Sequence, residues 1–151
     1  MDKNKVRQLV LAGLFTALTV VGAFIKIPFF PVPFTLQTLV TALAGIFLKP
    51  RWAAGSQIVY LLLGLMGAPV FAAGGGLGYA LRPTFGYLLL LPVAAALISR
   101  LQTTAAGSFR STFMHVVVGH VLILFGGSIW LYVNMRYIAA VDIDVQTAVF
   151  S

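Results

Sequence analysis

The sequence predicts an all-α polytopic membrane bundle, and two observations support this prediction. No Lys, Arg, Asp or Glu occurs in five long runs, which are residues 8–25, 27–48, 52–81, 83–99 and 111–135. A helix needs about 20 mostly apolar residues to cross a bilayer. The composition agrees, because 60% of the 151 residues are hydrophobic and 9% are charged. We therefore expect a single integral membrane domain over residues 1–151, with spans at about 8–25, 35–48, 52–66, 85–99 and 111–132 and a tail at 133–151.

The basic residues predict the orientation of the chain. They alternate between the gaps that separate the runs, seven on one side and three on the other: Lys3, Lys5, Arg7, Lys49, Arg51, Arg100 and Arg110 against Lys26, Arg82 and Arg136. The richer side is normally cytoplasmic, so we expect a multi-pass plasma-membrane protein with a cytoplasmic N-terminus. The net charge of +7 does not indicate a nucleic-acid partner, because the basic residues are scattered at span ends and are not gathered on one face.

The first span carries a stripe of small residues, Ala12, Gly13, Thr16 and Ala17. Small residues four positions apart let another helix approach closely in lipid. That helix can belong to this chain or to a partner subunit, and the spacing alone favours packing within the chain.

The connection between the first two spans is rich in proline. Pro28, Pro31 and Pro33 fall within six residues, and each removes a backbone donor and restricts the residue before it. Apolar, non-helical backbone at a membrane is tolerated where it is buried in protein or lines a cavity. We expect a lid or cavity wall with Thr35 and Gln37 as its polar groups. The alternative is a simple interfacial turn.

A second irregular segment follows the third span. Residues 67–87 contain six glycines and two prolines, which excludes a regular helix. By the alternation of charges this segment lies on the same outer face as the proline-rich connection, so the two together can roof a cavity. Arg82 is expected to be the only strong cation nearby and suits a ligand carboxylate. A topology-setting role for Arg82, with glycines that only let the chain turn, is equally favoured.

The remaining spans, at about 85–99 and 111–132, flank a polar loop at residues 100–110. Trp130 and Tyr132 are expected in an aromatic belt at the outer membrane surface.

The sequence offers few groups for catalysis or ion coupling, and His115 and His120 are the ionisable exceptions within the spans. It contains no cysteine, and its three acidic residues, Asp2, Asp142 and Asp144, all lie outside the spans. Ion-coupled carriers normally keep ionisable groups inside the membrane, and no P-loop motif is present. We therefore expect no enzyme, no catalytic residue, no metal site and no cofactor. A ligand could bind within the membrane, with energy supplied by a partner.

Several motifs resemble the BioY family of biotin transporters. Residues 31–37 (PVPFTLQ) are similar to the PVPxTLQ signature of that family. Four further matches follow in the same order as in the family: residues 48–51 (LKPR), 60–64 (YLLLG), 67–76 (GAPVFAAGGG) and 82–88 (RPTFGYL). The resemblance covers about residues 6–135.

The resemblance implies a biotin-binding S component of an energy-coupling factor (ECF) transporter, with five spans present of a six-span fold. Biotin would lie near the outer face under the two irregular segments. The substrate-binding residues carried over from the family motifs are Pro33, Thr35, Gln37, Phe71, Gly75, Gly76, Arg82, Thr84 and Tyr87. Ala12, Gly13, Thr16 and Ala17 would dock a transmembrane coupling subunit, and two ATPase subunits would supply energy.

The sequence departs from the family pattern at two places. Arg82 and Phe85 stand where the motif has glycines, so either can fill space in the pocket, and Arg82 can instead contact the ligand carboxylate. Family members continue into a sixth span with an Asp and a Lys near its start, whereas this sequence ends at Ser151. The expectation is a copy truncated at the C-terminus. The alternative function is a non-transporting membrane remnant, or a helix-packing subunit without ligand binding.

Overall fold

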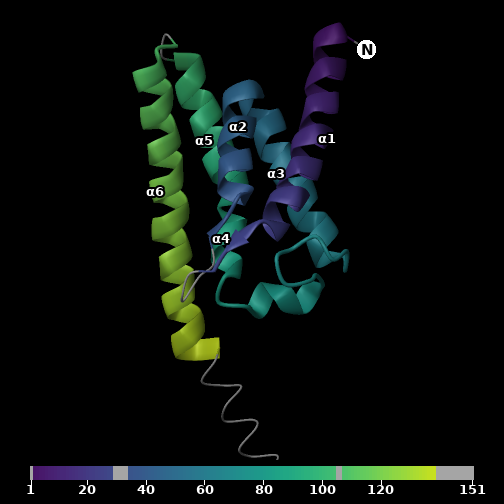
Figure 1. Ribbon diagram of the computed structural model, residues 1–151, viewed down its shortest axis with the longest axis vertical. Coiled ribbons are helices and arrows are strands. Elements are labelled where there is room, and N and C mark those ends of the chain that lie inside the picture. The colour runs from purple at the N-terminus through teal and green to yellow at the C-terminus, as the bar shows by residue number, and fades with distance from the viewer. Residues whose placement is uncertain (1, 29–33, 105–106, 139–151) are drawn as a thin grey trace, which may run out of the picture.

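The computed structural model describes residues 2–28, 34–104 and 107–138, most of which are helical (Figure 1). In chain order the elements are α1 (Lys3–Phe24), β1 (Lys26–Ile27), β2 (Phe34–Thr35), α2 (Gln37–Phe47), α3 (Pro50–Leu65), the 3-10 helix η1 (Leu77–Leu81), α4 (Phe85–Leu89), α5 (Leu91–Thr104), α6 (Phe109–Val133) and the π-helical turn η2 (Asn134–Ile138). Helix α5 packs against α2, α3 and α6, and α1 packs on α2 and α3. The expected all-α polytopic bundle is confirmed.

Local sequence signals explain where several helices begin. Pro50 starts α3, where its missing N–H costs no hydrogen bond. Ser108 caps α6, because its hydroxyl accepts a hydrogen bond from the backbone N–H of Ser111 at 3.2 Å. The segment expected as one span at 85–99 is broken into α4 and α5, and it continues to Thr104. Pro92, the second residue of α5, lacks the N–H that an unbroken helix would use there.

The helices differ in length. Within the part of the chain that the structure describes, three stretches are long and apolar enough to cross a membrane, by length and composition: Lys3–Phe24, Phe85–Thr104 and Phe109–Tyr137. Helix α3 has 16 residues and α2 has 11. An 11-residue helix is about 16 Å long, whereas the hydrocarbon core is about 30 Å thick. Helix α2 by itself is therefore too short for the span expected at 35–48.

A short antiparallel hairpin of β1 and β2 precedes α2, where the sequence pattern indicated no strand. Lys26 pairs with Thr35, and Ile27 pairs with Phe34. The pairing satisfies backbone groups that cannot join a helix in this proline-rich connection. Pro31 and Pro33 lie outside the described residues.

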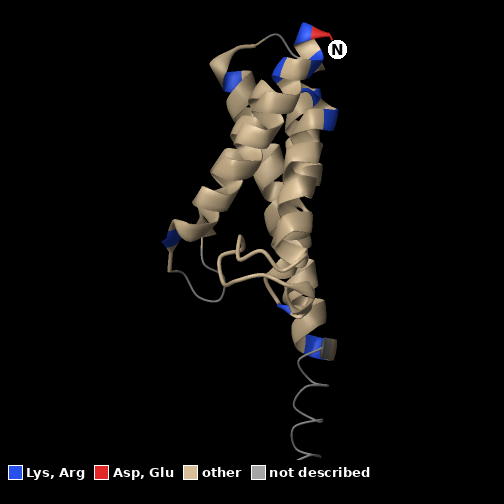
Figure 2. Cartoon of the chain, turned by 90° about the vertical axis from the view of Figure 1, so that its right-hand side faces the viewer, with Lys and Arg blue, Asp and Glu red and all other residues tan. Residues whose placement is uncertain are grey.

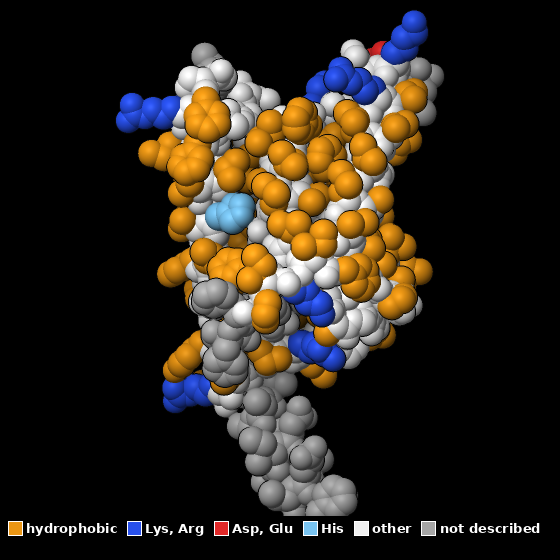
Figure 3. Space-filling view, in the orientation of Figure 1, with side chains coloured by type: hydrophobic (Ala, Val, Ile, Leu, Met, Phe, Trp, Pro, Cys, Tyr) orange, Lys and Arg blue, Asp and Glu red, His pale blue; other side chains and the backbone are white. Residues whose placement is uncertain are grey.

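The surface matches a protein that sits in lipid. Figure 2 shows the Lys and Arg residues toward the two ends of the bundle, and Figure 3 shows hydrophobic side chains over much of the face between them. Leu9, Val10, Val21, Val121 and Phe125 are at least half exposed on α1 and α6. Apolar surface of this extent on long helices indicates a multi-pass membrane protein.

A buried polar seam joins α1, α2 and α3. Gln57 is fully buried; its Nε2 donates to Thr19 Oγ1 at 3.1 Å, and its Oε1 accepts from Thr41 Oγ1 at 3.2 Å. The backbone carbonyl of Gln37, 2.8 Å from Thr41 Oγ1, shares the single proton of this hydroxyl with Gln57. Hydrogen bonds between helices contribute to their association in lipid, so this seam anchors the start of α2, where Gln37 lies.

Candidate ligand-binding cavity

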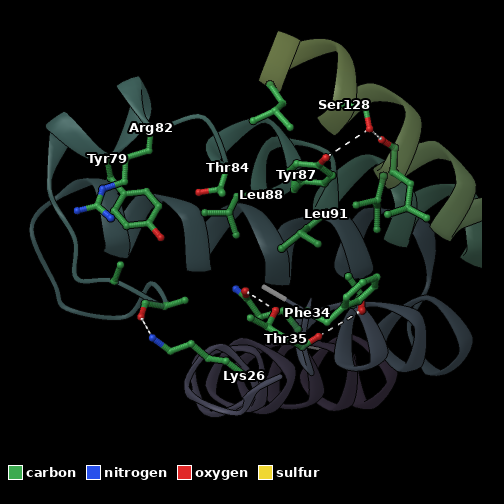
Figure 4. Close-up of a pocket in the computed structure, with 17 residues that line it drawn as sticks. Lys26, Phe34, Thr35, Tyr79, Arg82, Thr84, Tyr87, Leu88, Leu91 and Ser128 are labelled. Atoms are coloured by element: carbon green, nitrogen blue, oxygen red, sulfur yellow. Dashed lines mark hydrogen bonds between the residues drawn. The ribbon is translucent and has the colours of Figure 1, made fainter. Parts of the chain in front are cut away.

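A cavity of about 550 Å³ lies between the hairpin, the start of α2, the glycine-rich segment (residues 67–84), α4, α5 and α6 (Figure 4). Its lining residues are Lys26, Phe34, Thr35, Gln37, Thr38, Ala72, Ala73, Tyr79, Arg82, Thr84, Tyr87, Leu88, Leu91, Ile123, Leu124, Ser128 and Leu131. Ile123 lies ten residues before the end of α6 at Val133, about 15 Å along the helix. The cavity therefore enters the membrane-spanning part of the bundle.

Two cations belong to the cavity lining. Lys26 Nζ donates to the Ala72 carbonyl at 2.5 Å, which ties the hairpin to the glycine-rich segment. The guanidinium carbon of Arg82 lies 4.9 Å from the centre of the Tyr79 ring, within the range of a cation–π contact. In Figure 4, Lys26, Tyr79 and Arg82 lie on the same side of the view. The expectation that Arg82 is the only strong cation nearby is therefore wrong.

Tyr79 adds a neutral hydroxyl to the side of the cavity that carries Lys26 and Arg82. Burial raises the pKa of the Tyr79 phenol, and the neighbouring Arg82 guanidinium opposes the rise without cancelling it. The phenol therefore stays protonated at neutral pH, and the charge on this side comes from Lys26 and Arg82. Since no acidic residue is among the described lining residues, this side suits an anionic group.

Hydroxyl and amide groups lie on the other walls of the cavity. Tyr87 Oη and Ser128 Oγ are 3.3 Å apart, which links α4 to α6. Thr35 Oγ1 donates to Gln37 Oε1 at 2.9 Å, and Gln37 Nε2 donates to Tyr60 Oη at 2.6 Å. Tyr60 Oη in turn donates to the Val70 carbonyl at 3.1 Å. These bonds hold Thr35 and Gln37 in place relative to the glycine-rich segment.

The glycine-rich segment folds back on α3. The N–H of Gly76 donates to the Gly64 carbonyl at 2.6 Å, and the φ of Gly76 is +105°, a conformation that favours glycine. Phe71 is fully buried, with ring centres 5.4 Å from Tyr60 and 4.5 Å from Tyr79. Its ring lies over Gly64, where a side chain would collide with it. This packing supports Tyr79 at the edge of the cavity.

The structure brings together five of the nine expected site residues. Those in the cavity lining are Thr35, Gln37, Arg82, Thr84 and Tyr87. Pro33 lies outside the described residues. Phe71, Gly75 and Gly76 are not in the lining, because Phe71 points into the core and the two glycines pack or bond against the end of α3.

One further expectation, that Phe85 can fill space in the pocket, is corrected. Phe85 is 4% exposed within the aromatic core and so does not fill the cavity. Trp130, expected in an aromatic belt at the outer membrane surface, is half-buried near the end of α6, where it packs over Gly86 and donates from Nε1 to the Arg82 carbonyl at 3.2 Å. Tyr132 is exposed at the end of α6, where it accepts a hydrogen bond from Arg136 at 2.7 Å.

Lys26, Tyr79 and the wall formed by α6 were not predicted from the sequence as parts of the cavity. Lys26 had a usable signal, since it is a cation at the start of the proline-rich connection. Ser128 lies between two apolar stretches of α6 and carries no such signal. Its place in the cavity follows from the packing of α6 on α4 and α5.

The comparisons with known proteins agree with the motifs. The profile of the BioY family matches residues 1–150. The chain belongs to the BioY family. This confirms the resemblance of the loop motifs. A "Probable biotin transporter BioY" of Lysinibacillus sphaericus is 43% identical over 137 residues, which are 90% of this chain and 70% of that protein. The "Biotin transporter BioY" of Thermotoga maritima is 47% identical over 96 residues, which are 63% of this chain and 57% of that protein.

A solved structure has the same fold as this BioY family member. It is the crystal structure of the S-component for biotin from an ECF-type ABC transporter, with a TM-score of 0.79 and 30% sequence identity. The similarity covers 90% of this chain and 77% of that chain. The described helices and loops thus have the arrangement of an S component.

The small-residue stripe on α1 of this BioY family member divides into two faces. Ala12 and Thr16 are buried, and Thr16 Oγ1 donates to the Ser56 carbonyl of α3 at 2.9 Å. Gly13 and Ala17 are exposed on the other face. Ala12 and Thr16 therefore pack within the chain, and only Gly13 and Ala17 are accessible to a partner.

Proposed function

We propose that this chain is the biotin-binding membrane subunit of an ECF-type uptake system and has no catalytic role. The observation that carries the proposal is the cavity, which combines two cations, an apolar wall and several hydrogen-bonding groups. Biotin offers the matching groups, a carboxylate on an apolar chain and a ureido group on a fused ring. The printed names of the relatives and of the similar structure support the same ligand.

The charges suggest how biotin is oriented. A carboxylate is stabilised beside Lys26 and Arg82, because charge-assisted hydrogen bonds are the strongest polar contacts that these side chains make. The fused ring then lies against Leu88 and Leu91, where its ureido group can bond with Thr35 or Gln37. In this pose the apolar chain of biotin connects its carboxylate, beside Lys26 and Arg82, to its fused ring, beside Leu88 and Leu91.

Equilibrium binding to the purified protein in detergent or nanodiscs tests this proposal. We expect saturable binding of biotin, weakened by Thr35→Val, Gln37→Leu and Tyr87→Phe. A neutral hydrogen bond contributes about 0.5–1.5 kcal/mol, which corresponds to about a 2–10-fold loss of affinity for each change. Thr104→Val, at the exposed end of α5, is the control and should leave affinity unchanged. Absence of saturable binding by the folded wild-type protein would favour the alternative of a non-binding membrane subunit.

The partners follow from the same proposal. We infer that a transmembrane coupling subunit and two ATPase subunits energise uptake, with the N-terminus of this chain in the cytoplasm. In support, the sequence carries no P-loop, and the described parts of the long helices carry no acidic side chain inside the bundle. The excess of basic residues at the N-terminal end supports the orientation.

The exposed part of the α1 stripe is the proposed docking site for the coupling subunit. Gly13→Leu is expected to abolish co-purification with that subunit while biotin affinity stays unchanged, because no described atom lies within 4 Å of a Cβ at this position. Gly55→Leu on α3 is the matched control, since a Cβ there also meets nothing within 4 Å. Equal co-purification of wild type and Gly13→Leu would exclude this face of α1 from the interface.

A further inference from the structure

We propose that Trp130 and Asn134, at the end of α6, are positioning residues that hold Arg82 at the cavity and so set a preference for ligands with a free carboxylate. The inference rests on the proposed function, because it concerns how the carboxylate end of biotin is recognised. The carrying observation is a pair of hydrogen bonds to two consecutive carbonyls. Asn134 Nδ2 donates to the Leu81 carbonyl at 2.7 Å, and Trp130 Nε1 donates to the Arg82 carbonyl at 3.2 Å.

These two carbonyls determine the backbone of Arg82. They belong to the planar peptide groups before and after its Cα, so holding both restricts φ and ψ of this residue. The N–H of Arg82 also donates to the Tyr79 carbonyl at 3.0 Å, and Pro83 favours an extended conformation at the residue before it. The observed φ of −70° and ψ of 144° are of that kind. The direction of the Arg82 side chain is thus constrained before any ligand arrives.

The two donors are built into the protein and do not lie free on its surface. Asn134 is 2% exposed, and a buried amide is stable only when it is hydrogen-bonded. Trp130 packs over Gly86, where a Cβ would lie 2.1 Å from the Trp130 Cβ. Trp130 lies near the end of α6, and Asn134 follows that end as the first residue of η2, so both donors reach the same loop from one end of α6.

The geometry affects the ligand through the charge of Arg82. The Arg82 side chain is long and flexible, and fixing its backbone and stacking its planar guanidinium on Tyr79 at 4.9 Å reduces the conformational entropy lost when it binds an anion. Without the two bonds, Arg82 can move away from the cavity while Thr35, Gln37 and the apolar wall remain. Recognition of the fused ring would persist, and the preference for a carboxylate would fall.

The test compares the affinity for biotin with that for biotinamide, in which the carboxylate is replaced by a neutral amide. We expect wild type to favour biotin by about tenfold or more, the value of one charge-assisted hydrogen bond. The ratio should fall several-fold in Trp130→Phe, which keeps a ring over Gly86, and in Asn134→Leu, and should fall furthest in the double variant, where the preference due to Lys26 remains. Tyr132→Phe, on the same part of α6 but outside the lining, should keep the wild-type ratio.

The ratio of the affinities for biotin and biotinamide distinguishes a loss of Arg82 positioning from a general loosening of the fold. A structural effect alone would weaken both ligands equally and leave the ratio unchanged, and that result in folded Trp130→Phe and Asn134→Leu would overturn the inference while the proposed function stands. Absence of binding of both ligands by wild type would overturn the proposed function and this inference together. Trp130→Phe is the milder change and keeps the test decisive if Asn134→Leu does not fold.

Discussion

Gly64→Ala is expected to unfold the protein at a lower temperature and to weaken biotin binding. A Cβ at residue 64 would lie 2.1 Å from Phe71 Cζ and 2.3 Å from its Cε1, well inside contact distance. Phe71 has no exposed surface and packs against Tyr60 and Tyr79, so its ring can move only by displacing the glycine-rich segment. Overpacking of this kind typically costs about 1–3 kcal/mol. Because Tyr79 and Arg82 follow on the same segment, we also expect a loss of biotin affinity.

The same helix provides a matched control for Gly64→Ala. A Cβ on Gly55 meets no described atom within 4 Å, and replacing a glycine by alanine inside a helix usually adds up to about 1 kcal/mol of stability. Gly55→Ala should therefore melt at or above the wild-type temperature in the same detergent. Equal melting of the two variants, measured by thermal unfolding followed by circular dichroism, would show that the contact between Phe71 and Gly64 is not limiting.

Replacing both cavity cations is expected to have the largest effect on the ligand. In Lys26→Met/Arg82→Gln the side chains stay similar in length while both positive charges are lost. A charge-assisted hydrogen bond contributes about 1.5–3 kcal/mol in general, and we take the lower end because both groups are exposed, which gives about tenfold for each charge. The double variant should therefore bind biotin about 100-fold more weakly and should discriminate poorly between biotin and biotinamide.

Matched changes at the other end of the bundle distinguish the effect of the two cavity cations from the effect of net charge. Lys49→Met/Arg100→Gln removes two positive charges near the start of α3 and on α5, away from the cavity lining. Its biotin affinity should match wild type in binding measurements at low and at physiological ionic strength. Equal losses in the two double variants would mean that net charge, and not Lys26 and Arg82, controls binding.

Much of the architecture could be predicted from the distribution of charge, glycine and proline along the chain. Long runs without charge are stable in lipid or in a core. The spans expected from them at 8–25 and 111–132 match α1 and α6 to within a few residues. Residues 67–84 are non-helical apart from the short η1, as their composition requires, whereas residues 85–87 begin α4. Thr35 and Gln37 were expected as polar groups of a cavity wall, and both are in the lining.

Features that depend on contacts between distant residues could not be read in this way. The hydrogen bond from Lys26 to Ala72 joins residues 46 positions apart, and the bond from Asn134 to Leu81 joins residues 53 positions apart. No local pattern encodes such pairs. Likewise, only the packing of α1 on α2 and α3 separates buried Ala12 and Thr16 from exposed Gly13 and Ala17.

The sequence by itself thus determined that this chain is a membrane bundle with two irregular loops and few ionisable groups, because lipid penalises charge and unpaired backbone at every position along the chain. The tertiary structure alone decided which side chains of those loops face the cavity and which support it. Phe71 turns into the core and Arg82 turns to the cavity, although both belong to the same irregular segment. The physical reason is that close packing against α3 and α6 chooses among the many conformations that glycine-rich backbone allows.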